Sequence, residues 1–345
     1  MRIFVPWNLP LYPPVKLALL ADALGAEGVS SNALLNDARL DPAAIRAASA
    51  TVSIDQMIAV FAAAARSGAP QGAAFRAGRR NQITCYGAYG FGLLSSPDFR
   101  QAIRFAVDYH HLAAPTVQLS IEERGACAAW VFDPLPHHRI DQALYRFIVE
   151  MQIGTLVALH SELLGEAFRP RELHLAYRRD DFAASFEREF DAPCFVESGR
   201  NKLVFDAAYL DRRHPRGNTT SFAEMERLCE RATQDIERSG GMAAKMRACI
   251  AAADREALCF DAIARQLNIP ERTLRRRLSD ENTSFSELVN DVRLVAAVKL
   301  LRDSLLPLED VAGELGFSDA ANFRQAFRRW TGFSPQEFRR RAAPA

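Results

Sequence analysis

The sequence predicts an α+β N-terminal domain followed by an all-α C-terminal domain, in which two helix-turn-helix units are joined by a long linking helix. Three observations predict this fold class. Alternation of apolar and polar residues, which is typical of strands, falls between residues 117 and 205 and is flanked by segments with helical spacing. From residue 241 onward the apolar residues follow helical spacing. In that part a short helix, a turn and a second, arginine-bearing helix occur twice.

Composition limits what the protein can be. The chain has 345 residues, of which 49% are hydrophobic, so two domains with buried cores are expected. The formal net charge is only +1, and residues 251–345 carry 15 Lys or Arg against 14 Asp or Glu. Affinity for a polyanion must therefore come from the placement of the arginines. The six cysteines include no CxxC pair and no histidine at metal-ligand spacing, so we expect reduced thiols and no metal site.

The N-terminal residues show no basic region followed by a long apolar core, and no stretch approaches the roughly 18 uncharged apolar residues of a membrane span. We therefore expect a cytoplasmic protein without a membrane segment. No Ser-His-Asp order, glycine-rich phosphate loop or paired-carboxylate motif stands out. The sequence favours a protein that is not an enzyme and needs no cofactor.

The first part of the N-terminal domain has apolar residues at every third or fourth position, which predicts helices. The stretch 83–96 differs, because glycines separate its aromatic residues, and we expect it to be a tight connection packed against the core. The expected helices span residues 15–24, 54–65 and 98–111.

Strand-like alternation follows these helices. Val117, Leu119 and Ile121 alternate with polar residues, and Arg124 and Gly125 then turn the chain, which predicts a hairpin. The remaining expected elements are a helix over residues 140–164, a third strand over 173–177 and a fourth over 202–205.

The last helix of this domain is predicted by Ser221 and Glu224, which have the spacing of a capping box. Gly240 and Gly241 would end it. We therefore place the domain boundary there. Residues 1–240 would form the N-terminal domain and residues 241–345 the C-terminal domain.

The first helix-turn-helix unit is predicted within residues 257–279. Its first helix has one apolar face, and after a turn at Asn268 a second helix starts at Pro270 and directs Leu274 and Leu278 to the core. The opposite face of the second helix carries Arg272, Arg275 and Arg276. Three guanidinium groups on one face repel one another, and a phosphate backbone or guanine edges would reverse that effect.

Ser284 and Glu287 form a second capping box and start the linking helix. A helix of roughly 18 residues spans about 27 Å at about 1.5 Å per residue. That length would allow the second helices of the two units to lie about one turn of B-DNA apart.

The second helix-turn-helix unit is predicted within residues 307–335. Pro307 opens its first helix, Gly316 allows a sharp turn, and Ser318 is expected to cap its second helix. The apolar stripe of that helix consists of Phe323, Ala326, Phe327 and Trp330. Its other face carries Ala321, Asn322, Arg324, Gln325, Arg328 and Arg329. Such a face is either a solvated helix surface or, given the helix-turn-helix context, a recognition helix for a major groove.

The segment from Phe260 to Arg340 resembles the DNA-binding domain of the AraC/XylS transcription regulators. The resemblance rests on LGFSD at 315–319, on FRQAFRRWTGFSPQEFR at 323–339, and on the linking-helix residues Arg293, Ala297, Leu300 and Leu301. It implies that the two units bind DNA and that the base-reading positions are Arg272, Arg275 and Arg276 in the first unit and Ala321, Asn322 and Gln325 in the second. Arg324 and Arg328 would serve the same groove as the second set. Ala321 has no hydrogen-bonding side chain, so the second unit would read a thymine methyl or mainly contact phosphates.

The N-terminal part resembles the arabinose-binding-like domain found in some of the same regulators. This resemblance rests on YGFGLLSSPDFRQAIRFAVDYHHL at 89–112, on FEREFDAPCFVESGRNKLVFDAAYL at 186–210, and on the closing helix. It implies small-metabolite sensing and dimerisation. As effector-binding candidates we select Tyr86, Tyr89 and His110, which lie in or near the glycine-rich stretch; ordinary core packing is the alternative for each.

Together these observations predict a sequence-specific DNA-binding transcription regulator, an activator, controlled by a small-molecule effector. Its expected partners are double-stranded operator or promoter DNA, the effector, RNA polymerase and a second copy of the chain in a homodimer. Two alternatives stay open at this point. The N-terminal domain would only dimerise or bind a protein partner, or it would be an enzyme domain fused to a DNA anchor.

Overall fold

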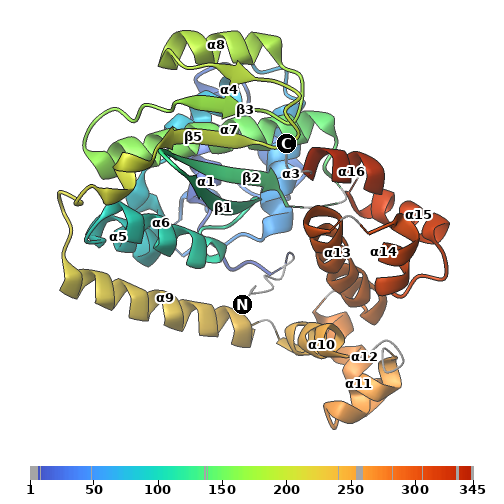
Figure 1. The fold of residues 1–345 in the computed structure, drawn as a ribbon. Coiled ribbons are helices and arrows are strands. Elements are labelled where there is room, and N and C mark those ends of the chain that lie inside the picture. The colour runs from blue at the N-terminus through green and yellow to red at the C-terminus, as the bar shows by residue number, and fades with distance from the viewer. Residues whose placement is uncertain are drawn as a thin grey trace. The chain divides into compact units, whose positions relative to one another are not determined.

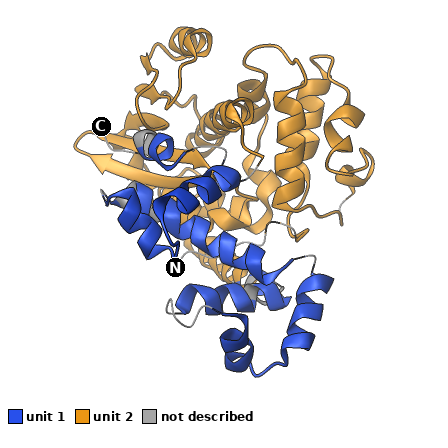
Figure 2. Ribbon diagram, turned by 90° about the vertical axis from the view of Figure 1, so that its right-hand side faces the viewer, with its two compact units in different colours: residues 1–6, 136–138, 234–342 blue, residues 7–135, 139–233, 343–345 orange. Residues whose placement is uncertain are grey.

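The computed structural model describes residues 7, 9–47, 49–135, 137, 139–239, 241–253, 259–281, 283–304, 306–331 and 334–342. They fall into two compact units, coloured separately in Figure 2. The N-terminal unit consists mainly of residues 7–135 and 139–233, and the C-terminal unit mainly of residues 234–342. Gly240, at the predicted domain boundary, lies outside the described residues.

The N-terminal unit combines helices with one five-stranded sheet (Figure 1). Its α-helices are α1 (Val15–Gly25), α2 (Ser31–Asn36), α3 (Ile54–Ala65), α4 (Ala73–Arg79), α5 (Gly87–Ser95), α6 (Phe99–Asp108), α7 (Gln142–Leu164), α8 (Asp180–Phe190) and α9 (Thr219–Ser239), of which residues 234–239 belong to the C-terminal unit. Its short 3-10 helices are η1 (Ala44–Arg46), η2 (Ile83–Tyr86), η3 (His110–Leu112) and η4 (Ala207–Asp211). Its strands are β1 (Val117–Arg124), β2 (Cys127–Pro134), β3 (Glu172–His174), β4 (Cys194–Phe195) and β5 (Lys202–Asp206).

The sheet has the strand order β1-β2-β5-β3-β4, with β3 and β4 parallel and the other neighbours antiparallel. On β2, Trp130 lies opposite Ile121 of β1 and Leu203 of β5. Because side chains alternate between the two faces of a strand, these three belong to one face. That face meets α7, since the Trp130 indole donates a hydrogen bond to Nε2 of His160 over 2.8 Å. The core of the unit therefore lies between the sheet and α7.

Helices α4 and α7 cross at two glycines. A Cβ added to Gly78 would lie 2.1 Å from the carbonyl oxygen of Met151, and one added to Gly154 would lie 2.1 Å from that of Phe75. Both distances are far below van der Waals contact, so the backbones of the two helices touch only because neither position has a side chain.

By length and hydropathy α7 is the one described helix that would qualify as a membrane span. The sequence analysis did not anticipate this. Of the qualifying window of α7, 72% is buried within the protein.

The glycine-rich stretch 83–96 was wrongly predicted as a connection, because it forms η2 and α5. Gly90 and Gly92 explain why glycine is present in this helix. A Cβ at Gly90 would lie 1.9 Å from the carbonyl oxygen of Ile83, and one at Gly92 would lie 2.3 Å from the ring of Phe105. The close packing of α5 on η2 and α6 thus offsets the low helix propensity of glycine.

Three further predictions for the N-terminal domain need correction. The third strand ends at His174 rather than at 177, and the two-residue strand β4 was missed, so Lys202–Asp206 is the fifth strand and not the fourth. The closing helix α9 begins at Thr219. Its first turn is capped by Asn218, whose Oδ1 accepts a hydrogen bond from the Ser221 amide over 2.9 Å. Ser221 is therefore inside the helix and forms no capping box.

Among the described residues of the C-terminal unit, all regular secondary structure is helical. Its helices are α10 (Gly241–Ala252), α11 (Phe260–Gln266), α12 (Glu271–Asp280), α13 (Phe285–Asp303), α14 (Leu308–Glu314), α15 (Ala320–Thr331) and α16 (Pro335–Ala342). Gly241, predicted to end the preceding helix, instead begins α10 with a φ of +60°. The linking helix α13 starts at the predicted capping box of Ser284 and Glu287.

Helix α13 contributes to two separate hydrophobic clusters. Its first half supplies Leu288 and Val289 to a cluster with α10, α11 and α12. Its second half supplies Ala297, Val298 and Leu301 to a cluster with α14 and α15. Each helix-turn-helix unit therefore has its own core, and one helix is common to both. Val295 of this helix is 41% exposed and belongs to neither cluster.

Candidate nucleic-acid interface and small-molecule pocket

The first helix-turn-helix unit consists of α11 and α12, as predicted. The turn between them contains Asn268 with a φ of +53°, a left-handed conformation that asparagine adopts more readily than most residues. Leu274 and Leu278 of α12 are buried against α11 and α13. The opposite face of α12 exposes the three predicted arginines, Arg272, Arg275 and Arg276.

The three predicted arginines, among the four of α12, differ in their contacts. Arg275 lies 3.6 Å from a carboxylate oxygen of Glu271, and its guanidinium carbon lies 4.3 Å from the centroid of the Phe260 ring. Within the described part of the chain, Arg272 and Arg276 form no ion pair. They are thus the two guanidinium groups on this face whose charge is not already compensated.

The second unit consists of α14 and α15, joined by a turn at Gly316 with a φ of +76°. The apolar stripe was predicted correctly: Phe323, Ala326, Phe327 and Trp330 are all buried. The predicted cap was wrong by one residue. Asp319, not Ser318, accepts the hydrogen bond of the Asn322 amide, over 2.7 Å, and this bond is the main cause of the lowered pKa of Asp319. The stronger acceptor, a carboxylate, occupies the capping position.

The exposed face of α15 carries every residue predicted for it, namely Ala321, Asn322, Arg324, Gln325, Arg328 and Arg329. The side chain of Asn322 is already engaged: its Nδ2 donates to Oγ of Ser318 and to Oδ2 of Asp319, both over 2.9 Å. Arg324 lies 3.4 Å from Glu309 of α14. No partner is found for Arg328 among the described residues. Asn322 could read a base only if its side-chain hydrogen bonds to Ser318 and Asp319 opened. Arg328 could contact DNA without breaking a bond to the described residues.

A small cavity lies within the N-terminal unit, bounded by α1, α5, α6, η2, η3, the sheet and α7. Its volume is about 50 Å³. The three effector-binding candidates, Tyr86, Tyr89 and His110, all line it. The structure adds Lys16, Trp130 and His160, among other residues, to this lining. Sequence analysis missed Lys16. The signal that could have found it is its position between Val15 and Leu17, where a charged residue interrupts the apolar start of α1.

Buried polar groups of this cavity are only partly hydrogen-bonded. Tyr89 donates to the carbonyl oxygen of Ala106 over 3.2 Å. The Tyr86 hydroxyl and Nδ1 of His110 are buried and have no hydrogen-bond partner within the described chain. Burial raises the pKa of both tyrosines, and burial, followed by the charge of Lys16, lowers the pKa of His110 to about 3.

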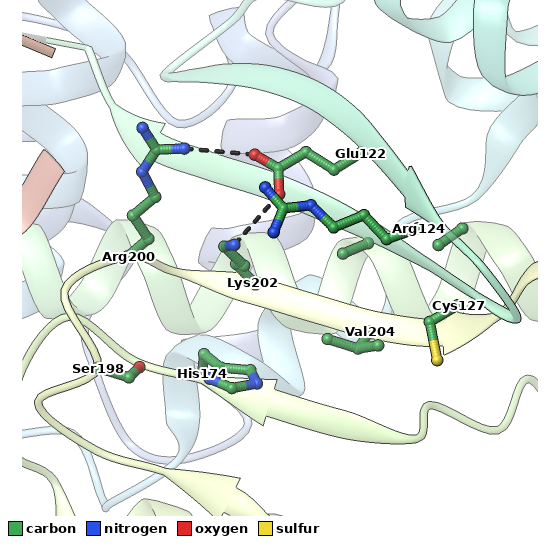
Figure 3. Close-up of a pocket in the computed structure, with 10 residues that line it drawn as sticks. Glu122, Arg124, Cys127, His174, Ser198, Arg200, Lys202 and Val204 are labelled. Atoms are coloured by element: carbon green, nitrogen blue, oxygen red, sulfur yellow. Dashed lines mark hydrogen bonds and ion pairs between the residues drawn. The ribbon is translucent and has the colours of Figure 1, made fainter. Parts of the chain in front are cut away.

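A second, larger hollow of about 200 Å³ lies on the outer face of the sheet (Figure 3). It is lined by basic residues of β1 and β5 and by the segment before β5. Glu122 lies 3.3 Å from Arg200 and 3.1 Å from Lys202, so one carboxylate compensates much of this charge. The walls of this hollow combine these charged side chains with the apolar residues Ala128, Ala129 and Val204. No group of three or more His, Cys, Asp or Glu in the described residues could hold a metal ion.

Comparison with known proteins identifies the family. A model of the arabinose-binding domain of AraC transcription regulators matches residues 28–214, which is more than half of the 345 residues, and a helix-turn-helix domain model matches residues 263–341. The chain belongs to the AraC family of transcription regulators. As a helix-turn-helix regulator of this family, it binds double-stranded DNA.

Individual members of the AraC family align over nearly the whole chain. The ornithine utilization regulator of Pseudomonas aeruginosa is 28% identical over 331 residues, covering 95% of this chain and 96% of the relative. An uncharacterized helix-turn-helix regulator of Mycobacterium tuberculosis is 26% identical over 344 residues, with 96% of each chain covered. The crystal structure of the transcriptional regulator CdpR from Pseudomonas aeruginosa matches with a TM-score of 0.49 and 24% identity, covering 94% of this chain and 98% of that one.

Proposed function

We propose that this AraC-family regulator is a sequence-specific activator that works in the cytoplasm under the control of a small molecule. The observation that carries the proposal is that the chain has both kinds of site. Exposed arginines lie on α12 and α15 of the C-terminal unit, and a cavity with polar and apolar walls lies within the N-terminal unit. Residues 1–240 would bind the effector and dimerise, and residues 241–345 would bind the operator and contact RNA polymerase. One relative, which aligns with 95% of this chain, is named an ornithine utilization regulator. That name supports control of this protein by a metabolite.

In this proposal α12 and α15 enter successive major grooves of one operator half-site. Arg272, Arg275 and Arg276 bond with base edges and phosphates from α12. From α15 the contacts come from Ala321, Asn322, Arg324, Gln325 and Arg328. Because Asn322 is held by its cap and Ala321 offers only a methyl group, the arginine contacts of α12 would carry most of the base discrimination.

The effector signal would pass through α6. One side of α6 lines the cavity with Ala102, Ile103 and Ala106. An adjacent side packs on α9, where the ring centroids of Phe105 and Phe222 lie 5.4 Å apart. A ligand that changed the position of α6 would therefore also change that of α9, the helix that leads into the C-terminal unit. Such a ligand acts only if it binds one arrangement more tightly than the other.

The test is footprinting of the purified protein on the DNA upstream of its own gene, over a salt series, with and without pools of metabolites. We expect a salt-dependent footprint that one pool strengthens or weakens. A footprint that no pool alters would contradict effector control and support an N-terminal domain that only dimerises or binds a protein partner. Consumption of the active compound would instead support an N-terminal enzyme.

A further inference from the structure

The walls of the N-terminal cavity are apolar apart from a few groups. Its apolar lining includes Leu93, Ile103, Leu119, Leu156, Leu159 and Leu163. At about 50 Å³ it holds a few water molecules, and small-molecule sites are usually larger, roughly 300 Å³ and above. A ligand with an apolar body would therefore have to widen the cavity, which links binding to movement of its walls.

Lys16 brings a positive charge to this apolar space. Its Nζ donates hydrogen bonds to the carbonyl oxygens of Ala113, over 2.6 Å, and Ala114, over 3.1 Å, and lies 5.3 Å from the ring centroid of Tyr86. No Asp or Glu within the described residues forms an ion pair with it. An ammonium group has three N–H donors, so one remains for a further acceptor. Burial lowers the pKa of Lys16 to about 8, which leaves it mostly charged at neutral pH.

Two further groups that line the cavity have no hydrogen-bond partner among the described residues. One is the hydroxyl of Tyr86, the residue whose ring Lys16 faces; it is buried and forms no hydrogen bond within the described part of the chain. Nε2 of His110 lies 3.2 Å from the carbonyl oxygen of Val117, so the neutral ring carries its hydrogen there and leaves Nδ1 as a bare acceptor. A buried donor or acceptor without a partner is costly, and such groups in a cavity indicate a missing ligand or water.

From this geometry we propose that the cavity binds a small organic monocarboxylate with an apolar body. The carboxylate accepts hydrogen bonds from the Lys16 ammonium and the Tyr86 hydroxyl, and a hydroxyl or N–H of the ligand donates to Nδ1 of His110. The apolar body lies against the leucine and isoleucine side chains of the walls. This inference rests on the proposed effector control and adds the chemical class of the effector.

The test compares acids with their uncharged amides on the full-length protein. The probes are hexanoate, phenylacetate and mandelate, each paired with its primary amide, and the measurements are calorimetric titration and the shift in melting temperature. We expect at least one acid to bind at least tenfold more tightly than its amide, because only the acid forms a charge-assisted bond with Lys16. Mandelate should gain further over phenylacetate through its hydroxyl. Equal binding of every acid and its amide, or no binding by any acid, would overturn the proposal.

Variants separate a ligand contact from a structural role. Lys16→Met should weaken the preferred acid about tenfold to hundredfold and leave the weak binding of its amide unchanged. Tyr86→Phe, which removes a single oxygen, should weaken the acid by a smaller factor and serves as the second variant if Lys16→Met fails to fold. Lys202→Met, in the other hollow of the same unit, is the matched control and should bind the acid as the native protein does. Loss of acid and amide binding alike in Tyr86→Phe would contradict the assignment.

The footprint distinguishes the two proposals. An uncharged or cationic metabolite that alters the footprint of the native protein and of Lys16→Met equally would overturn the monocarboxylate class and leave effector control in place. A footprint that no metabolite pool alters would remove effector control itself, whatever the acids do in the titration.

Discussion

Arg293 of the linking helix α13 donates a hydrogen bond from Nη2 to the carbonyl oxygen of Gly316, over 3.2 Å. Its guanidinium also lies 4.9 Å from the centroid of the Phe317 ring. Gly316 is the left-handed residue at the turn between α14 and α15. The linking helix therefore holds the turn that orients α15, and Arg293 acts on α15 without belonging to its exposed face.

Replacing Arg293 with Met should remove both contacts. We expect the C-terminal unit to lose about 1–3 kcal/mol of stability and operator affinity to fall with it, because a carbonyl and a ring lose a charged partner. Thermal melting and operator titration measure the two effects. Arg328→Met is the control: it should weaken DNA binding without lowering the melting temperature. Unchanged melting of Arg293→Met would show that the contact does not support the turn.

Arg276→Ala tests base reading by α12. If Arg276 forms a bidentate bond with guanine, operator affinity should fall by about 1–3 kcal/mol and specificity should relax at one position. The measurement is titration of the operator, of operators with single substitutions, and of random DNA. Arg277→Ala, which removes the neighbouring exposed arginine, is the comparison. Equal losses on operator and random DNA would make Arg276 a phosphate contact instead.

Asn322→Ala should act mainly on stability. Both N–H groups of its side chain are bonded to Ser318 and Asp319, so their removal should cost about 0.5–1.5 kcal/mol and leave the preferred operator sequence unchanged. Melting curves and selection from a randomised operator pool provide the two measurements. A changed base preference with unaltered melting would mean that the capping bonds open on DNA and that Asn322 reads a base.

Gly154→Ala tests the crossing of α4 and α7. The new Cβ would lie 2.1 Å from a backbone oxygen of α4, so the helices must separate and we expect a loss of at least about 1–3 kcal/mol. Gly25→Ala, at the end of α1 with no atom within 4 Å of the added Cβ, should be neutral or slightly stabilising. Urea unfolding of both variants measures the difference, and similar midpoints would show that the crossing adapts without cost.

Glu150 predicts a dependence of stability on pH. This carboxyl of α7 is buried, and desolvation raises its pKa to about 7 even though Arg179 lies 3.8 Å away. Between pH 4.5 and 7 the folded state therefore binds more protons than the unfolded state, so this group adds stability as the pH falls through 7 and costs stability above it. The other charged groups that influence it are Asp181 and Arg146.

Glu150→Gln should mimic the protonated carboxyl. At pH 8 we expect the variant to exceed the native protein by about 2–4 kcal/mol, and by pH 5 the gain should fall below about 1 kcal/mol. Hydrogen exchange of the α7 amides at the two pH values measures this. Glu166→Gln, at an exposed carboxylate paired with Arg212, is the control and should show no such dependence. A gain from Glu150→Gln that is equal at both pH values would contradict the raised pKa.

Periodicity predicted the helices of the C-terminal unit well, because their apolar faces repeat over several turns. It failed at the helix starts, where a single side-chain hydrogen bond decides which residue caps the helix. Ser318 and Asp319 are both good capping residues, and only the path of the chain after Gly316 selects Asp319. Likewise Asn218 starts α9 three residues before Ser221, the residue that the capping-box spacing had indicated.

The N-terminal unit was harder to predict for a different reason. The helicity of α5 depends on Gly90 and Gly92 lying against Ile83 and Phe105, which are tertiary contacts that no local pattern reports. The candidates Tyr86, Tyr89 and His110 do line one cavity, but Lys16, which also lines it, is far from all three in the sequence and only the fold brings it there. Whether these residues bind an effector, and whether the arginine faces read DNA as assigned, stay predictions.

Helix α10 has a consequence for exchanging parts between regulators. It supplies Met242, Ala243 and Met246 to the core of the first helix-turn-helix unit. At the start of α10 the Glu281 carboxylate accepts hydrogen bonds from the backbone amides of Met242 and Ala243. The match to the helix-turn-helix domain model begins only at residue 263. A chimera that joined the N-terminal domain of another regulator to this chain at residue 263 would lack part of the core of the first helix-turn-helix unit. We therefore expect that a transplanted DNA-binding part must include α10, so the graft should be made upstream of Gly241.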